Sequence, residues 1–310
     1  MSNDLVLARR DRVLDAMSDA GIDVLVLGRQ DNAGYACGMR RLWTAGTRPF
    51  GAGCIVVGST GRIHVLSSWE DGIEPPMTFD DLYPLTWNPR IMAVSMAGID
   101  GLAGAGRIGV DELTPSFQRA AASFAPDAEV VAADNLMADV RLHKLSGEIE
   151  AIARTCATVW VGVEAVLSAS ERSDPAAAAI EALSSRGVTV PSSGVQVERR
   201  GEALAIDIGV ICDLYEGGVG GVFVDSRRAG SSALVDACRA GATHADLAAA
   251  ATGDWLVRGL GMGFERPVIG PGVGARERLE AGMVLSVTDG PHRDVVHVTA
   301  DGPAVLSQRP

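Results

Sequence analysis

Short apolar segments alternate with amphipathic ones through the first 137 residues, and this pattern restricts the possible folds more than any other feature. Residues 4–20 have apolar side chains near one helical face and arginines on the other, which predicts a helix ending at Gly21. A second helix is predicted over 116–124. Strands are predicted over 23–27, 53–58, 63–66, 107–111 and 129–132. This alternation indicates an α/β domain with a mostly buried sheet.

Two further segments of this half are connections. Residues 59–61 have the composition of a hairpin turn between two of the strands. The prolines at 75, 76, 84 and 89 predict an irregular stretch over 70–90.

The rest of the chain begins with a long helix, predicted over 146–170, with Ser146 as its cap and two glutamates at its positive end. Other helices are predicted over 174–186, 230–240 and 244–258, and strands over 203–211, 283–288 and 295–299. A chain of 310 residues usually divides in two, because single cores stop growing near this size. We expect domains 1–138 and 139–310 in a mixed α/β (α+β) chain.

Composition excludes several partners. The formal net charge is -12, so we expect no binding to nucleic acid or to an anionic membrane surface. No apolar run reaches the length that spans a membrane, and the N-terminus does not resemble a secretory signal. The five cysteines are scattered without a CxxC pair, which predicts free thiols in a reducing cytoplasm.

Several segments together resemble the superfamily of creatinase, aminopeptidase P, prolidase and methionine aminopeptidase. In the first domain the matching pieces are 9–27, Asn32, Tyr35, Gly38 and 107–111. The junction 140–152, with its Arg…Lys…Glu-Ile run, resembles the segment that opens the family's catalytic domain. Their order and spacing imply a creatinase-type N-terminal domain.

The second domain resembles the family's pita-bread fold, in which two pseudo-symmetric α–β halves enclose a pocket. The matching segments are 204–209 with Tyr215, 259–267, 279–287 and 298–302. They resemble the first metal-ligand strand, the Gly-His-Gly-x-Gly…His-Glu-x-Pro loop, the Leu-Glu-x-Gly-Met-Val strand and the Val-Thr-x-Asp-Gly end. The resemblance implies a shortened pita-bread domain.

The family's metal ligands are largely replaced. Two metal ions held close together need two Asp, one His and two Glu, because hard cations require several anionic oxygens. The first Asp falls on Asp207 and is kept. The remaining ligand positions fall on Gly218, Leu260, Thr288 and Arg293, and a further active-site His falls on Phe264. Gly, Leu and Arg cannot bind a cation at neutral pH. We therefore expect no metal and no other cofactor.

Creatinase, within this family, works without metal. It uses a His from the segment before the strand of Asp207, together with two Glu at former ligand positions. Here that segment, 191–198, contains no His, so the creatinase mechanism is not predicted either.

Asp207 and its surroundings are the first candidate site. Asp207 lies in an apolar strand and is expected to be buried, where a lone carboxylate must pair or protonate. We expect Arg293 to occupy the vacated metal position and pair with it; bonding of Asp207 to backbone amides or water is the alternative. His292 and His297 lie near this strand. Either could be an acid–base group at neutral pH or an ordinary hydrogen-bonded surface histidine.

The other candidates lie in three places. Glu265 and Arg266 could hold the amine and carboxylate of a substrate, or form a salt bridge within their loop. Tyr215 could be a general acid or a packed residue at a strand end. Arg41 and Arg48 follow the Gly38 motif, and the resemblance implies that this part can reach a neighbouring subunit's pocket; solvated charge is the alternative. The proposed catalytic set is Asp207, Glu265, His292 and Tyr215, and the proposed substrate-binding set is Arg266, Arg293, Arg48 and Arg41.

A glycine-rich stretch over 216–221 superficially resembles a nucleotide-binding loop. It matches neither the dinucleotide fingerprint nor the P-loop, and it contains no Lys. We expect these glycines to fill the space of lost ligand side chains or to form a turn between strands.

Two classes of function remain. The first is a metal-independent, repurposed enzyme that acts on a small amino-acid-derived or amide-like substrate, or on a peptide, by hydrolysis, elimination or isomerisation. The second is an inactive pseudo-peptidase that serves as a binding or scaffold protein. An open pocket lined by polar side chains favours the first, and a pocket filled by Leu260 and Phe264 favours the second. The resemblance also implies a homodimer.

Overall fold

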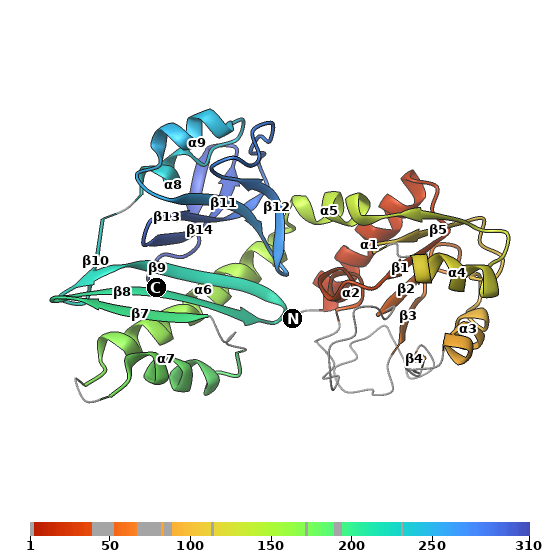
Figure 1. The fold of residues 1–310 in the computed structure, drawn as a ribbon, viewed down its shortest axis with the longest axis horizontal. Coiled ribbons are helices and arrows are strands. Elements are labelled where there is room, and N and C mark those ends of the chain that lie inside the picture. The colour runs from red at the N-terminus through yellow and green to blue at the C-terminus, as the bar shows by residue number, and fades with distance from the viewer. Residues whose placement is uncertain are drawn as a thin grey trace. The chain divides into compact units, whose positions relative to one another are not determined.

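The structure is a computed structural model that describes residues 3–38, 53–66, 82–83, 89–112, 115–170, 173–188, 194–230 and 232–310. The chain forms two compact units, Met1–Val140 and Arg141–Pro310. Figure 1 shows the helices and strands of each unit in chain order, from red to blue.

The N-terminal unit alternates helices with strands. Its helices are α1 (Asn3–Asp19), α2 (Gln30–Cys37), α3 (Pro89–Ala97), α4 (Pro115–Phe124) and the larger part of α5 (Asp134–Leu142). Its strands are β1 (Val24–Leu27), β2 (Cys54–Val57), β3 (Ile63–Leu66), β4 (Leu82–Tyr83), β5 (Arg107–Val110) and β6 (Glu129–Ala132). In the described residues they form one sheet in the order β4-β3-β2-β1-β5-β6. The predicted α/β domain is confirmed.

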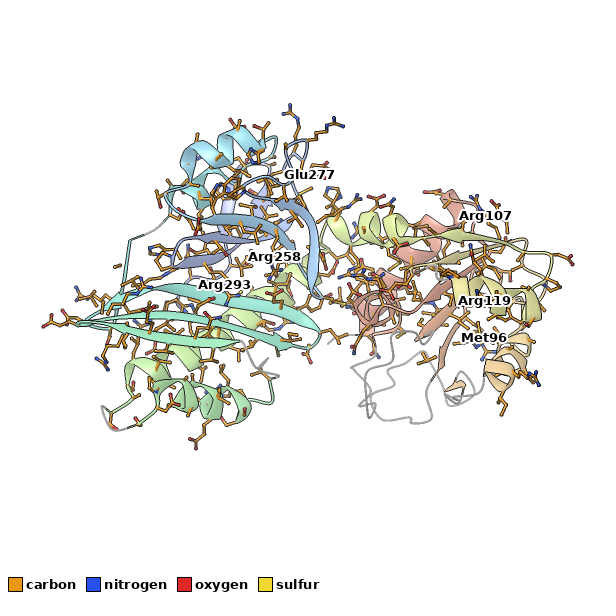
Figure 2. All side chains as sticks on the ribbon, in the orientation of Figure 1. Met96, Arg107, Arg119, Arg258, Glu277 and Arg293 are labelled. Atoms are coloured by element: carbon orange, nitrogen blue, oxygen red, sulfur yellow. The ribbon has the colours of Figure 1, made fainter. Side chains whose placement is uncertain are left out.

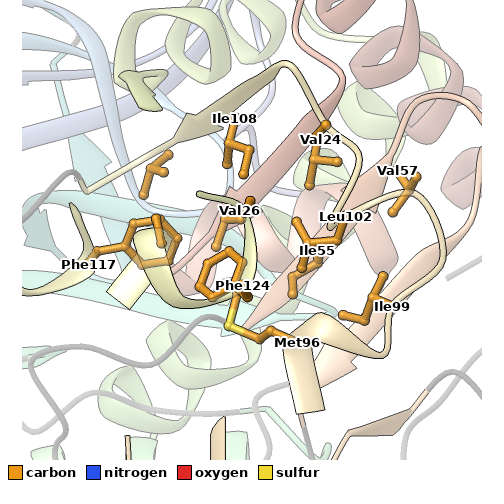
Figure 3. Packing of buried hydrophobic residues seen from close by; sticks show 14 residues of the cluster. Val24, Val26, Ile55, Val57, Met96, Ile99, Leu102, Ile108, Phe117 and Phe124 are labelled. Carbon is orange, nitrogen blue, oxygen red and sulfur yellow. The ribbon is translucent and has the colours of Figure 1, made fainter. Parts of the chain in front are cut away.

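Helices cover this sheet on both faces, which explains why β1 is buried at all four positions. On one face Val24 and Val26 pack with Ile108 and with Phe117 and Phe124 of α4 (Figure 3). Leu25 and Leu27 alternate with them and are buried on the other face, where α2 packs against β1 and β2.

Asp111 connects the end of β5 to the start of α2. Its carboxylate accepts hydrogen bonds from the backbone N–H of Gly28 at 2.7 Å, that of Arg29 at 3.1 Å and Nδ2 of Asn32 at 2.9 Å. Burial raises the pKa of Asp111 to about 6, although these bonds act in the opposite direction.

Sequence reasoning missed three helices in this unit, namely α2, α3 and α5. α2 contains glycine and few apolar residues, so it has no clear helical period. α3 begins at Pro89, at a helical first turn that tolerates proline, within a stretch that the prolines predicted to be irregular. β4 also lies in that stretch, whose other residues at 70–81 and 84–88 are outside the described part. All five cysteines are free, as expected.

The C-terminal unit contains a larger sheet with helices on it. The helices are α6 (Ser146–Leu167), α7 (Pro175–Ser184), α8 (Ala233–Ala237) and α9 (His244–Ala250). The strands are β7 (Val195–Arg200), β8 (Ala203–Cys212), β9 (Tyr215–Val224), β10 (Arg227–Ala229), β11 (Trp255–Leu260), β12 (Phe264–Ile269), β13 (Val284–Asp289), β14 (His292–Thr299) and β15 (Gly302–Val305). Among described residues the strand order is β12-β11-β13-β14-β9-β8-β7, with β10 on β9 and β15 on β14.

This sheet has two halves, each with its own helices and apolar core. α6 and α7 pack on β8 and β9 through residues such as Val163 and Ile208. α8 and α9 pack on β11, β13 and β14 through Leu247 and Val287. β14 meets β9 where Arg293 is paired with Gly220. Two α–β halves of this kind form the predicted pita-bread domain.

Three sequence predictions for this unit are wrong. The helix predicted over 244–258 ends at Ala250, because Asp289 binds the backbone N–H groups of Thr252 and Gly253 and ends it before β11 begins. The glycine-rich stretch 216–221 is part of β9, so of its two interpretations the turn is wrong. Residues 259–267, expected as a loop, form the end of β11, a turn and the start of β12.

Candidate functional site

Strand register brings four of the five predicted ligand positions to one face of the C-terminal sheet. Side chains of directly paired residues lie on the same face. The pairs are Asp207 with Gly220, Gly209 with Gly218, Gly220 with Arg293, Arg293 with Thr288 and Thr288 with Leu256. The intervening residues, such as Ile208 and Val287, belong to the cores under the helices. We call the side that carries Asp207, Gly218, Thr288 and Arg293 the inner face.

Asp207 and Arg293 form an ion pair on the inner face. Arg293 donates a hydrogen bond from Nε to Oδ1 of Asp207 at 2.7 Å, and its Nη2 lies 2.6 Å from the same oxygen. The pair predicted from the sequence is therefore present. The expected burial of Asp207 is wrong: its side chain is 42% exposed, because it points away from the helices, whereas that of Arg293 is 15% exposed.

Glycines make room for the Arg293 guanidinium. A Cβ atom at Gly218 would lie 2.8 Å from Cζ of Arg293, and one at Gly209 would lie 3.0 Å from its Nη2. Real Cβ contacts are not that short, so any side chain at Gly218 would have to displace the guanidinium. The interpretation that these glycines leave space is supported at Gly218, with an arginine as the occupant.

A second arginine holds the backbone of this region. Arg228 donates from Nη1 to Oδ1 of Asp294 at 2.7 Å and from Nη2 to Oδ2 at 2.8 Å. Its Nη2 also donates to the carbonyl oxygen of Gly220 at 2.6 Å and to that of Arg293 at 3.3 Å. Ser307 donates to Oδ1 of Asp294 at 2.8 Å. Because bidentate pairs have a fixed geometry, Arg228 fixes β14 against β9 beside the ion pair.

A groove of about 580 Å³ opens at the ion pair. Its lining comes from α7, β7, β8, β13, β14 and the turn between the last two. The residues are Ala176, Val195, Gln196, Val197, Glu198, Arg200, Ala205, Ile206, Asp207, Thr288, Gly290, Pro291, His292 and Arg293. His292 and Thr288 thus share one groove with Asp207 and Arg293, and the volume lies in the range of small-molecule sites.

Glu265 does not line this groove and is held in a buried cluster of charges instead. Its Oε1 lies 2.6 Å from Nη2 of Arg141, and its Oε2 lies 2.6 Å from Nζ of Lys144. The backbone N–H of Met262 also donates to Oε1, at 3.0 Å. Burial acts to raise the pKa of Glu265, but Lys144 and Arg141 together lower it below its usual value. The arrangement is that of a structural ion cluster.

Tyr215 and Arg266 are not in the groove either. Tyr215 is fully buried at the start of β9, and its hydroxyl donates to Oε1 of Glu148 at 3.2 Å. Arg266 follows Glu265 in β12 and precedes the cis bond to Pro267. Arg41 and Arg48 lie outside the described residues. His297 is on β14, and burial lowers its pKa.

The residues at the former ligand positions do not fit a dinuclear metal centre. A guanidinium pairs with the single carboxylate, Leu260 is buried at the end of β11, and Gly218 has no ligand atom. Across the described ranges, no group of three or more His, Cys, Asp or Glu is placed to hold a metal ion. No step through a metal follows from these side chains.

Sequence reasoning missed a second ion pair on the inner face. Arg258 of β11 hydrogen-bonds through Nη2 to Glu216 of β9, so it also connects the two halves of the sheet. Figure 2 labels Arg258 and Arg293, which extend from β11 and β14. In the sequence, Arg258 is a lone arginine two residues before Leu260, and nothing in that segment indicates that it pairs with Glu216.

Comparison with known proteins agrees with this architecture. Residues 9–143 match the model of the creatinase/prolidase N-terminal domain. Prolidase from Pyrococcus horikoshii OT3 superposes with a TM-score of 0.71 at 15% identity, over 98% of this chain and 99% of that one. Prolidase from Pyrococcus furiosus superposes with a TM-score of 0.68 at 18% identity, over 97% of this chain and 99% of that one. X-Pro aminopeptidase from Thermotoga maritima MSB8 superposes with a TM-score of 0.67 at 15% identity, over 97% of this chain and 98% of that one.

These matches define a two-domain protein of the pita-bread class. Residues 9–143 match the creatinase/prolidase N-terminal domain, and the chain shares the fold of these prolidases and of the aminopeptidase. No curated protein sequence matches it significantly. In the part of the chain that the structure describes, no helix combines the length and apolar character needed to cross a membrane.

Proposed function

We propose that this chain is a metal-independent, repurposed relative of the Xaa-Pro peptidases that acts on a small amino-acid-derived or amide-like substrate bound in the groove. Unshared hydrogen-bonding capacity at the ion pair supports this proposal. Arg293 uses Nε and Nη2 on one oxygen of Asp207, and among the described residues its Nη1 and Oδ2 of Asp207 have no other partner. A hydrogen-bond donor of Arg293 and an acceptor of Asp207 thus remain available on two residues that line the groove.

Three polar groups of the groove have a role in this proposal. Arg293 holds a carboxylate or amide oxygen of the substrate, as guanidinium groups do well. Asp207 accepts a hydrogen bond from an ammonium or amide N–H. His292, which lines the same groove, moves the proton that hydrolysis, elimination or isomerisation requires.

Calorimetric titration with free amino acids and dipeptides, in the presence of a chelator, tests the proposal. We expect Arg293→Gln and Asp207→Asn to weaken binding at least tenfold. Arg276→Gln, an exposed arginine outside the groove, should leave binding unchanged. Arg293→Lys keeps the charge and should have an intermediate effect, and the melting temperature of each variant reports its folding. Binding that requires added manganese, cobalt or zinc, or that ignores Arg293→Gln, contradicts the proposal.

A pseudo-peptidase that only binds a partner is the second candidate. It is favoured by the positions of Glu265 and Tyr215, which are buried in internal hydrogen bonds and so leave fewer groups for chemistry. Product analysis by NMR after incubation with the ligands that bind separates the two, since a binding protein returns them unchanged. We further propose a cytoplasmic homodimer, as the family resemblance implies; light scattering on the eluting protein tests its mass.

A further inference from the structure

The groove has a second arginine–carboxylate pair in its lining. Glu198 and Arg200 of β7 border the same space as Asp207 and Arg293. Nη2 of Arg200 lies 2.7 Å from Oε2 of Glu198. Both side chains are more than half exposed, so they stand at the open rim, whereas the Arg293 pair is deeper.

Strand register sets the separation of the two pairs. Gln196 is paired with Asp207, Glu198 with Ala205 and Arg200 with Ala203, so Gln196, Glu198 and Arg200 share the inner face. A strand advances about 3.3 Å per residue, which places Arg200 about 13 Å along β7 from the level of Asp207. The two pairs therefore mark the ends of one row.

The lining between the pairs suits a slim chain that contains amide groups. Ala205, which lies on the inner face between Asp207 and Ala203, carries only a methyl group. Gln196, beside Asp207, has an amide that can both donate and accept hydrogen bonds. Bulky or branched ligands gain no matching pocket from these residues.

We propose that Glu198 and Arg200 form a distal subsite, and that the groove takes a linear peptide of three to four residues with one charged terminus at each pair. This inference rests on the proposed function of the groove. An extended chain covers about 3.3–3.6 Å per residue, so about four residues span the row. Each pair contains one positive and one negative side chain. A peptide with an ammonium group at one end and a carboxylate at the other therefore finds an opposite charge at each end.

The ionisation of the distal pair agrees with this arrangement. Hydrogen bonding and charge from Arg200 hold the pKa of Glu198 below its usual range. The carboxylate is therefore charged at neutral pH, as recognition of an ammonium group requires.

A chain-length series tests the subsite. Titration of the full chain with dialanine, trialanine and tetraalanine should give an affinity that rises about fivefold from the shortest to the longest, the scale of an exposed charge contact. In the double variant Glu198→Gln/Arg200→Gln this ratio should fall to about one, while the affinity for dialanine stays unchanged. Arg199→Gln lies on the same strand but the opposite face, and it should keep the wild-type ratio.

The outcomes separate the two proposals. Equal affinity for all three peptides in the wild type, or a ratio that survives the double variant, overturns the distal subsite but leaves the Arg293 site intact. Binding of none of the peptides or amino acids overturns both. N-acetylated and C-amidated tetraalanine each lack one terminal charge, so neither should bind more tightly than dialanine. If both still bind more tightly, the distal subsite does not recognise terminal charge.

Discussion

Arg293 donates from Nε to Oδ1 of Asp207 at 2.7 Å, and its Nη2 lies 2.6 Å from the same oxygen. From the motif placement we propose that Asp207 keeps the position of a ligating aspartate and that Arg293 occupies the position of a ligating glutamate. On this placement, one exchange removes a carboxylate and supplies a cation to its neighbour. The single remaining aspartate keeps a positive partner, so its charge stays compensated without an ion.

The two faces of β9 should respond differently to an added methyl group. At Gly218 a Cβ would meet the end of the Arg293 side chain, which can move, whereas at Gly217 it would lie 2.9 Å from the backbone nitrogen of Cys156 in α6, which cannot. We expect Gly217→Ala to lower the free energy of unfolding by about 2–3 kcal/mol and Gly218→Ala by less than about 1 kcal/mol. Urea denaturation measures both.

Ligand binding should be affected more by Gly218→Ala than by Gly217→Ala, which is the reverse of the order for stability. Gly218→Ala pushes the guanidinium away from Asp207 and should weaken amino-acid or peptide binding several-fold, whereas folded Gly217→Ala should bind normally. Equal stability losses at the two glycines would mean that Arg293 is held as rigidly as the helix backbone.

Restoring carboxylates should create a cation site. The triple variant Gly218→Asp/Thr288→Glu/Arg293→Glu places three new carboxylates on the inner face with Asp207, which is a donor set that suits hard divalent cations. We expect its melting temperature to rise with millimolar manganese, because a ligand that binds only the folded state stabilises it. The wild-type melting temperature should not respond. A wild-type response that Asp207→Asn abolishes would show that Arg293 does not block the position.

Local patterns explain how much of this molecule was predictable. The period of 4–20 and the apolar run at 23–27 predicted α1 and β1 within one residue, because side-chain burial there follows the strand or helix repeat. The pairing of Asp207 with Arg293 followed from two motifs that each fixed one position. In both cases the information lies within a few residues of the structure it predicts.

Long-range pairings could not be obtained in this way. Glu265 finds its cations 121 and 124 residues earlier in the chain, at Lys144 and Arg141. Both segments were noted as motifs, yet nothing in one sequence connects them. Arg228 likewise reaches Asp294 across 66 residues. Tertiary contacts also determine the secondary structure at Trp255. Strand pairing with Asp289 overrides the helical tendency of the alanines that precede it.

The buried cluster around Glu265 should make the C-terminal unit sensitive to acid. Because the folded-state pKa of Glu265 is depressed, its contribution to stability is present above the unfolded value of 4.5 and is lost as the pH falls through the folded value. Glu265→Gln leaves two cations without their anion and should cost about 3–5 kcal/mol at pH 7. Urea denaturation between pH 3 and pH 7 should show this difference shrinking below about pH 4.5. A constant difference over that range would assign the loss to packing.

Asp111 in the N-terminal unit should have the opposite pH dependence. Burial raises its folded-state pKa to about 6 from an unfolded value of 3.8, so the folded state binds the proton more tightly. Its contribution is then fully present below pH 3.8 and is lost as the pH rises through about 6. Relative to Asp111→Asn, which does not titrate, the wild type should lose up to about 3 kcal/mol of stability between pH 4 and pH 6. Carbon-detected NMR titration of the Asp111 carboxyl gives its pKa directly, and a midpoint below 4 would show that the three donors outweigh the burial.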